Sequence, residues 1–177
     1  AKFTPVTYTY YEQLNNYKYL KTLGIGHHFY QGKYIDAIGE VLDTDKKTIV
    51  HIPNVNSAES SKDKYEEVGH IIDIMGEFVK RCEDTGIIHV RRKDGKVLKV
   101  ADLVEDDEKD RQRVTKFLRE SKELADLDII IALGMAKEGF DWPWCEHSLT
   151  VGYRRSLQEV VQIIGRCTRD SSNKEHA

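Results

Sequence analysis

The last third of the chain, residues 128–169, constrains the fold more than any other stretch. Residues 129–132 form a short, continuous apolar run, which is typical of a strand covered on both faces of a parallel sheet. Residues 149–151 repeat this pattern after a loop. Ser156 and Glu159 have the spacing of a capping box, so we expect a helix to begin at Ser156. Strands that alternate with helices in this way predict an α/β domain.

The predicted helix combines an apolar face with two arginines near its end. Helical spacing gives that face the residues Leu157, Val160, Val161 and Ile164. Arg166 and Arg169 are three positions apart, so we expect both to project from one side of the helix end. Two fixed cations can offset the charge that develops during phosphoryl transfer. The alternative is a pair of surface arginines, which the helix dipole favours at a C-terminus.

The letters around these features resemble two motifs of the superfamily 2 helicases. Residues 162–169 read QIIGRCTR and resemble motif VI, whose pattern is Q-x-x-G-R-x-x-R. Residues 136–143 read AKEGFDWP and resemble motif V, which ends in E-G-x-D-x-P in several DNA-acting members. The two motifs occur in the order of the family and at a compatible distance. The resemblance is closest to the motor subunits of restriction enzymes and to excision-repair-type helicases.

This resemblance implies roles for individual residues. Arg169 matches the arginine finger of the family, and Arg166 matches the arginine that also approaches the nucleotide phosphates. Gln162 matches the position that couples the nucleotide to the other half of the motor. Gly139 and Asp141 match the motif V positions near the nucleotide sugar.

The resemblance also favours DNA over RNA as the nucleic-acid partner. Leu133 and Gly134 stand where RNA helicases of the DEAD-box type carry Thr-Asp. Neither residue offers a side chain to a backbone phosphate. Contacts with nucleic acid at this point would therefore fall to main-chain amides or to Lys137.

Upstream of this region, the apolar spacing continues to alternate between helix and strand. It predicts a helix over residues 34–42, a strand over 48–52 and a long helix over roughly 58–83. The inner face of the long helix is expected to carry Tyr65, Val68, Ile71, Ile72, Met75, Phe78 and Val79. The turn between the strand and the long helix contains Asn54 and Ser57, and it loosely resembles motif IV, a nucleic-acid contact region. Main-chain N–H groups at a helix start can meet a phosphate in such a turn.

A basic hairpin is predicted in the middle of the chain. A strand over residues 87–90 is followed by Asp94 and Gly95, the signal for a two-residue hairpin loop. The basic residues around this turn are Arg91, Arg92, Lys93, Lys96 and Lys99. They could form a hairpin that tracks phosphates or separates strands, or a solvated loop insertion, and the sequence leaves both readings open. The acidic run 105–110 then begins a helix whose inward residues are Val114, Phe117 and Leu118.

The first 30 residues are rich in tyrosine and are expected to form a linker. Residues 11–23 have the spacing of a helix that ends near Gly24. The tyrosines could stack on bases, but packing of the linker against its own domain is the more common arrangement. Because the sequence begins without Met and stops soon after motif VI, we expect it to be a piece of a longer protein.

Composition excludes several other classes of protein. The net charge of −3 argues against a generally basic nucleic-acid binder, so any such contact must come from a local patch. The three cysteines are widely spaced and form no pattern of metal ligands, which is typical of reduced thiols in a cytoplasmic protein. No apolar run approaches the ~18 residues of a membrane span, so no membrane partner is expected.

Together these features predict an α/β fold with a mainly parallel sheet, helices on both faces and a basic β-hairpin insertion, and the resemblance implies that it is a RecA-like three-layer sandwich. The resemblance assigns residues 31–177 to the second RecA-like domain of a helicase. The sequence lacks both G-x-x-x-x-G-K-[ST] and D-E-x-[DH], so ATP and Mg²⁺ would be held mainly by an N-terminal RecA-like domain of the same parent chain. The alternative is a stand-alone α/β module that binds nucleic acid or protein without motor activity.

Overall fold

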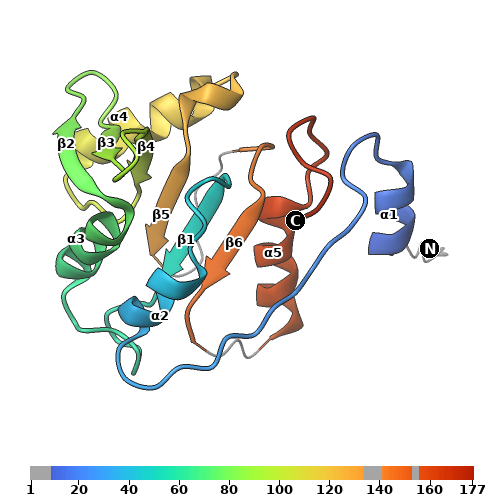
Figure 1. The fold of residues 1–177 in the computed structure, drawn as a ribbon, viewed down its shortest axis with the longest axis horizontal. Helices are drawn as coiled ribbons and strands as arrows, with labels where there is room; N and C mark the ends of the chain where they lie inside the picture. Colours follow the sequence, from blue (N-terminus) through green and yellow to red (C-terminus); the bar gives the residue numbers. More distant parts are fainter. Residues whose placement is uncertain (1–8, 134–140, 153–155) are drawn as a thin grey trace, which may run out of the picture.

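A six-stranded sheet forms the centre of the molecule (Figure 1). The computed structural model describes residues 9–133, 141–152 and 156–177. The strand order is β2-β3-β4-β5-β1-β6. Strands β4, β5, β1 and β6 are mutually parallel, whereas β2 and β3 form an antiparallel edge. The strands are β1 (Thr48–Ile52), β2 (Glu77–Arg81), β3 (Ile88–Arg91), β4 (Val97–Asp102), β5 (Ile129–Leu133) and β6 (His147–Thr150).

Helices cover both faces of this sheet. They are α2 (Tyr34–Val41), α3 (Lys64–Met75), α4 (Glu108–Glu120) and α5 (Leu157–Cys167). The short helix α1 (Tyr10–Asn16) buries none of its residues and lies beyond α5 (Figure 1). Apolar residues of α2 and α3 pack with Val50 and Ile131 on one face. On the other face Ile49 and Ile130 pack with α4, with the end of α5 and with Trp142. This arrangement confirms the predicted α/β sandwich with a mainly parallel sheet. In the described part of the chain, no helix is long and apolar enough to cross a bilayer.

The two central strands, β1 and β5, confirm that a continuous apolar run predicts a strand covered on both faces. All five residues of β1 are buried, and β5 is buried over residues 129–132. Each of these strands lies between two parallel neighbours, so both of its side-chain faces meet a layer of helices. A strand in that position reads as a continuous apolar run rather than as an alternating one.

The predicted long helix over residues 58–83 is wrong at both ends. The helix α3 begins at Lys64 and ends at Met75, and the following residues turn back as β2. Gly76 forms the junction, where an added Cβ would lie 2.1 Å from the backbone oxygen of Arg91. Phe78 is therefore on an edge strand and 52% exposed, not inward on a helix. The apolar spacing ran through this junction, whereas the glycine marked the true helix end.

The hairpin exists, but its turn and its relation to the sheet differ from the prediction. The Arg92 N–H donates to the Lys96 oxygen at 2.8 Å, and the Gly95 N–H donates to the Arg92 oxygen at 2.9 Å. The loop thus has three residues and ends on Gly95 at φ 89°, the usual glycine bulge of such turns. Its second strand, β4, pairs with β5 and buries Leu98 completely. The hairpin therefore extends the main sheet rather than standing apart as an insertion.

The helix α5 begins as predicted and presents a different face. Ser156 caps it by accepting the Glu159 N–H at 3.2 Å. The residues that it buries are Ile163 and Cys167, while Leu157 is 78% exposed, so the predicted apolar face is wrong in part. The helix also ends at Cys167, which places Arg169 beyond it. The two arginines consequently do not share one helix surface.

The N-terminal helix is shorter than predicted. The helix α1 ends at Asn16, and the chain continues in an extended form. We name residues 17–24 the strap. Leu20 at its centre is completely buried, whereas Tyr11 and Tyr19 are exposed. An aliphatic side chain, not the tyrosine cluster, anchors this segment to the domain.

Candidate functional site

The structure brings the two predicted motifs into contact. Asp141, from the connection between β5 and β6, forms an ion pair with Arg169, just beyond α5, with 3.6 Å between Oδ1 and Nε. Both side chains are more than half exposed. An exposed pair of this length contributes little to stability, about 0–1 kcal/mol. What matters is its position, because it leaves a carboxylate and a guanidinium side by side and open to solvent.

A buried block beneath this pair holds the two motifs together. Trp142, Cys145 and Cys167 pack in the same apolar cluster. The buried Nζ of Lys174 donates to the Cys145 oxygen at 2.7 Å and to the Cys167 oxygen at 2.9 Å. Asn173 adds a hydrogen bond from Nδ2 to the Trp144 oxygen at 3.0 Å. The segment that follows Arg169 therefore fastens the end of α5 to the loop that carries Asp141.

Burial sets the protonation of the groups in this block. It raises the pKa of the Cys145 and Cys167 thiols, which keeps both neutral. It lowers the pKa of Lys174. The two carbonyl oxygens that Lys174 meets include the last one of α5, at the negative end of the helix dipole. An ammonium in that position satisfies a helix end that would otherwise be buried without a donor.

A second contact connects this block to the strap. The Asp170 carboxylate accepts the N–H groups of Lys18 at 2.8 Å, Tyr19 at 2.9 Å and Leu20 at 2.9 Å. Desolvation by burial raises the pKa of Asp170, but these three hydrogen bonds outweigh it and leave the pKa below its ordinary value. Asp170 directly follows Arg169, so the strap is attached next to the exposed guanidinium.

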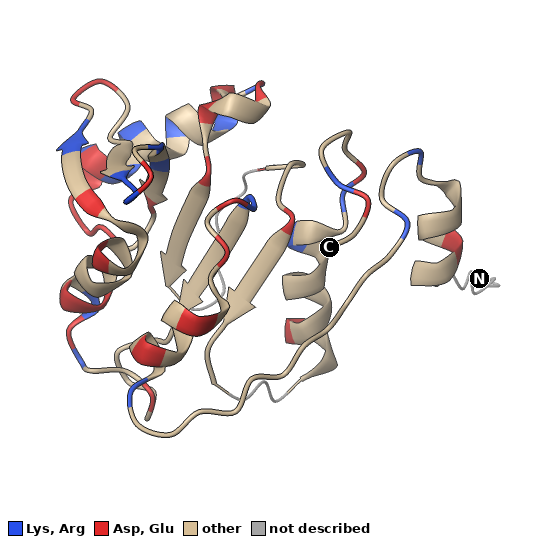
Figure 2. Cartoon of the chain, in the orientation of Figure 1, with Lys and Arg blue, Asp and Glu red and all other residues tan. Residues whose placement is uncertain are grey.

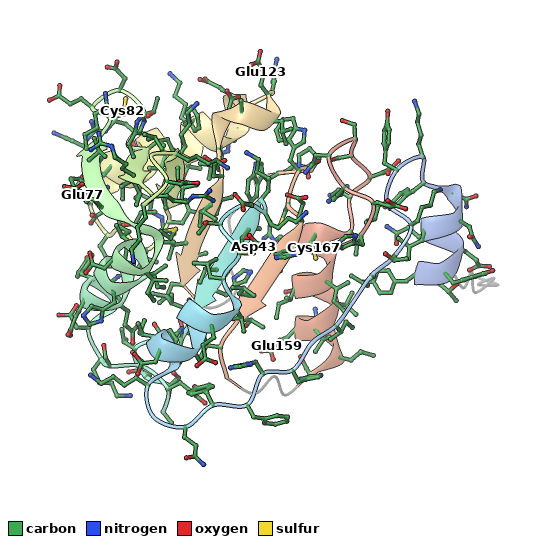
Figure 3. The ribbon with its side chains drawn as sticks, in the orientation of Figure 1. Asp43, Glu77, Cys82, Glu123, Glu159 and Cys167 are labelled. Carbon is green, nitrogen blue, oxygen red and sulfur yellow. The ribbon has the colours of Figure 1, made fainter. Side chains whose placement is uncertain are left out.

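The arginines do not lie at the carboxyl edge of the sheet, where open α/β sheets usually bind their ligands. The arrowheads of β1, β5 and β6 point to one end of the sheet (Figure 1). The helix α5 starts near that end and runs back along the sheet, with Glu159 near its start and Cys167 at its end (Figure 3). Eleven helical residues span about 16 Å, so Arg166 and Arg169 stand toward the amino edge.

Gln162 and Arg166 occupy one side of α5, because they are four residues apart. Gln162 is exposed, and Arg166 is half-buried in the last turn. Gly139 and Lys137 lie outside the described residues. The structure thus places Arg169, Arg166, Gln162 and Asp141 on α5 and its immediate surroundings.

The turn with Asn54 and Ser57 lies at the opposite edge, directly after β1. The Ser57 N–H donates to the Asn54 oxygen at 2.8 Å, which closes the turn, and Asn54 is exposed. At the start of the following helix, N–H groups that could meet a phosphate are already paired within the chain. The Asp63 carboxylate accepts the N–H groups of Tyr65 at 3.0 Å and Glu66 at 3.1 Å. A carboxylate therefore already fills the position that an anion would take.

A buried glutamate fixes the connection that follows this turn. Glu67 of α3 is completely buried, and its Oε1 accepts the Ser60 hydroxyl at 3.0 Å and the Ser61 N–H at 2.5 Å. Desolvation by burial, followed by the charge of Glu67, raises the pKa of Tyr34. Glu67 falls within the predicted long helix, but it was not predicted to be a buried polar residue. Its position among apolar residues on α3 was the available signal.

The basic hairpin is separated from both of these places. Because β4 runs parallel to β5, the turn before it lies at the amino edge, across the sheet from α5 (Figure 1). Arg92 pairs there with Asp94 and, at 2.5 Å, with Asp45. Side-chain hydrogen bonds to Asp94 and Asp45 raise the pKa of Arg92. Arg91 lies 3.9 Å from the Glu77 carboxylate, whereas Lys93 is exposed.

Charge of both signs covers this side of the molecule. Figure 2 shows acidic residues interleaved with basic ones over β2, β3, β4 and α4. The basic residues of the hairpin thus have acidic residues as neighbours on the adjoining elements. In the described part of the chain, no group of three His, Cys, Asp or Glu side chains could hold a metal ion.

Comparison with known proteins gives one strong similarity. No family model matches the chain. A protein of Bacillus subtilis (strain 168) named "Putative ATP-dependent helicase YeeB" is 69% identical over 176 residues, which cover 99% of this chain. The chain resembles a segment of a longer protein. The matched region spans 29% of that relative, so most of the relative has no counterpart in the 177 residues.

Proposed function

We propose that this chain is the second motor domain of an ATP-dependent helicase or translocase that acts on DNA. The observation that carries the proposal is the contact between Asp141 and Arg169, which brings the motif V-like and motif VI-like segments together at an exposed position. The name of the B. subtilis relative supports the same class of enzyme. The α/β sandwich supports it as well, because it is the architecture that the motif resemblance implies.

In this proposal, the chain contributes to ATP hydrolysis without binding ATP by itself. Arg169 acts as the arginine finger that stabilises the charge on the transferring phosphoryl group. Its ion pair with Asp141 runs through Nε, so the two Nη atoms of the guanidinium fork can face a phosphate. Arg166 and Gln162 approach the nucleotide from α5, and Gly139 and Asp141 lie near its sugar. ATP and Mg²⁺ are held mainly by an ATP-binding domain elsewhere in a longer polypeptide.

The contact with DNA is assigned to the carboxyl edge rather than to the hairpin. Asn54 is exposed in the turn after β1, whereas Ser57 is half-buried there with its Oγ hidden from solvent, so its backbone rather than its hydroxyl would face DNA. In the sequence, Lys137 follows β5. Arg92 is closely paired with two neighbouring acids, which weakens the alternative of a binding module built on the hairpin. RNA remains the less favoured partner, because the residues after β5 lack the Thr-Asp of the DEAD-box type.

ATP hydrolysis by the complete helicase, without nucleic acid, with DNA and with RNA, tests the proposal. We expect turnover that DNA stimulates more than RNA. The Arg169→Gln variant should lose that turnover while it keeps the circular dichroism spectrum of the parent protein. Full activity of this variant would exclude an arginine finger at Arg169, and stimulation by RNA alone would overturn the choice of DNA.

A further inference from the structure

Backbone hydrogen bonds join the strap to the last residues of the chain. The Lys21 N–H donates to the Glu175 oxygen at 2.7 Å, and the Gly24 N–H donates to the Ala177 oxygen at 2.8 Å. The Ala177 N–H returns a bond to the Thr22 oxygen at 3.1 Å. These contacts run beside the Asp170 carboxylate described above. The two segments therefore behave as one small ladder at the end of α5 (Figure 1).

Asp170 is the point at which this ladder meets the exposed guanidinium. One oxygen, Oδ1, accepts the N–H groups of Tyr19 and Leu20, and Oδ2 accepts that of Lys18. Three successive N–H groups on one carboxylate fix both the carboxylate and the backbone that bears it. Leu20 is completely buried, so the strap cannot shift without exposing an apolar side chain. On the other side of Arg169 in the sequence, Lys174 binds the backbone oxygen of Cys167, two residues before the arginine.

We propose that Asp170 is a positioning residue for Arg169, through which the segment that precedes the domain sets the place of the guanidinium. The inference rests on the proposed function, because the position of Arg169 matters only if Arg169 acts on a nucleotide. The strap lies between the start of the chain and α2, on the path from any preceding ATP-binding domain to the sheet. Movement of such a domain would pull on the strap and thereby on Asp170.

The chain offers a matched control in Asp126. Its Oδ2 accepts the Lys122 N–H at 3.2 Å, the Glu123 N–H at 3.1 Å and the Ser121 hydroxyl at 3.0 Å. Asp126 thus caps a backbone turn much as Asp170 does, and hydrogen bonds likewise lower its pKa against the effect of burial. It lies before β5, far along the chain from Arg169. A purely structural role would make Asp126→Asn and Asp170→Asn equivalent.

The experiment compares steady-state ATP hydrolysis by the complete helicase and its variants Asp170→Asn, Asp126→Asn, Arg169→Lys and Arg169→Lys with Asp170→Asn. We expect Asp170→Asn to lower kcat by about 10- to 100-fold, the loss expected of a misplacement near 1 Å, with little change in the KM for ATP. Asp126→Asn should stay within about twofold of the parent. Adding Asp170→Asn to Arg169→Lys should cost little more, because both changes act through the same guanidinium.

Hydrogen exchange provides a readout that does not depend on turnover. In Asp170→Asn the amides of residues 18–20 should exchange faster, while those of β1 and β5 remain protected. This pattern would show that the fold is intact and that only the contact between the Asp170 carboxylate and the strap has opened. Unchanged protection of residues 18–20 would overturn the inference.

The kinetic outcomes separate the inference from the proposed function. If Arg169→Lys loses activity and Asp170→Asn behaves like Asp126→Asn, the positioning role is wrong and the motor assignment stands. If the losses of Arg169→Lys and Asp170→Asn multiply in the double variant, Asp170 acts elsewhere and the inference is again wrong. If Arg169→Lys and Arg169→Gln both retain full activity, the proposed function fails and the inference fails with it.

Discussion

The hairpin between β3 and β4 and the segment around the end of α5 both carry two closely spaced arginines, yet their surroundings differ. In the hairpin, Arg92 lies between Asp45 and Asp94, and its side chain is 17% exposed. At the end of α5, the Arg169 side chain is 61% exposed and has one long contact with Asp141. Arg92 stabilises the local structure of the hairpin, whereas most of the Arg169 side chain is open to solvent and can bind a ligand. The number of cations in a stretch of sequence therefore says less than the acids that the fold places beside them.

The largest effect is expected from Arg169→Gln. It should lower ATP turnover by about 10³-fold or more, because an arginine finger stabilises the transition state rather than bound ATP. The melting temperature should change little, since the lost ion pair is exposed. Arg91→Gln is the matched control, because Arg91 is also half-exposed and pairs at 3.9 Å with an acid. Equal losses of ATP turnover in the two variants would mean that Arg169 has no catalytic role that the hairpin arginine lacks.

The hairpin region should instead respond to changes in its backbone. Gly76→Ala places a Cβ against the backbone of Arg91 and should cost about 2 kcal/mol or more in the free energy of unfolding. Urea denaturation measures this loss. Gly69→Ala in the preceding helix meets no atom within 4 Å and should stabilise the protein by roughly 0.5–1 kcal/mol. A neutral Gly76→Ala would mean that β2 is not packed against β3 in this way.

The strap should show an intermediate effect through Leu20→Ala. Removing this fully buried side chain should cost about 2–4 kcal/mol locally and should speed hydrogen exchange over residues 17–24. Turnover should fall in parallel, by less than in Arg169→Gln. Leu14→Ala, on a half-buried position of α1, is the control and should leave the exchange of residues 18–20 nearly unchanged.

Arg92→Gln should affect stability and not catalysis. The change removes the partners of Asp45 and Asp94, so a small fall in melting temperature is expected. ATP turnover and DNA affinity should remain within about twofold of the parent, the range of most changes away from a site. A large loss of DNA affinity would restore the hairpin as a nucleic-acid contact.

The smallest effect is a dependence of the strap on acid. The folded-state pKa of Asp170 is lowered, so its contribution is fully present above the unfolded value of about 3.9 and is lost as the pH falls through the folded value. The strap should therefore stay attached at neutral pH and detach only below about pH 4. Hydrogen exchange of residues 18–20 against pH measures this step. In Asp170→Asn the step should disappear.

Local patterns predicted the parts of the fold that depend on neighbours in sequence. The strand β1 was predicted with its true bounds, β5 nearly so, and the cap at Ser156 was correct. The end of α3 was missed because apolar spacing continued past Gly76, whose role depends on the distant backbone of Arg91. The buried face of α5 was predicted only in part, because Cys167 packs with Trp142 and Cys145, which are distant from it in the sequence.

In the candidate site, too, local motifs were predicted and contacts between distant residues were not. Arg169 and Asp141 were found through their motifs, and the structure adds that they touch. Asp170 and Lys174 were not found, because their partners are separated by many residues and no pattern announces them. Asp170 in particular meets the strap 150 residues away in the chain. Such contacts are visible only once the sheet has brought both ends of the chain together.

The outer strand β2 has a consequence for the behaviour of the protein at high concentration. An edge strand offers unpaired backbone groups on which a second molecule can build a continuous intermolecular sheet. In β2, the pairing with β3 shifts register between Phe78 and Lys80, which breaks the flat edge, and charged residues stand at both ends of the strand. Replacing Lys80 with an apolar residue would remove one of the charges that oppose intermolecular pairing, and fibril-like aggregation should then start at β2.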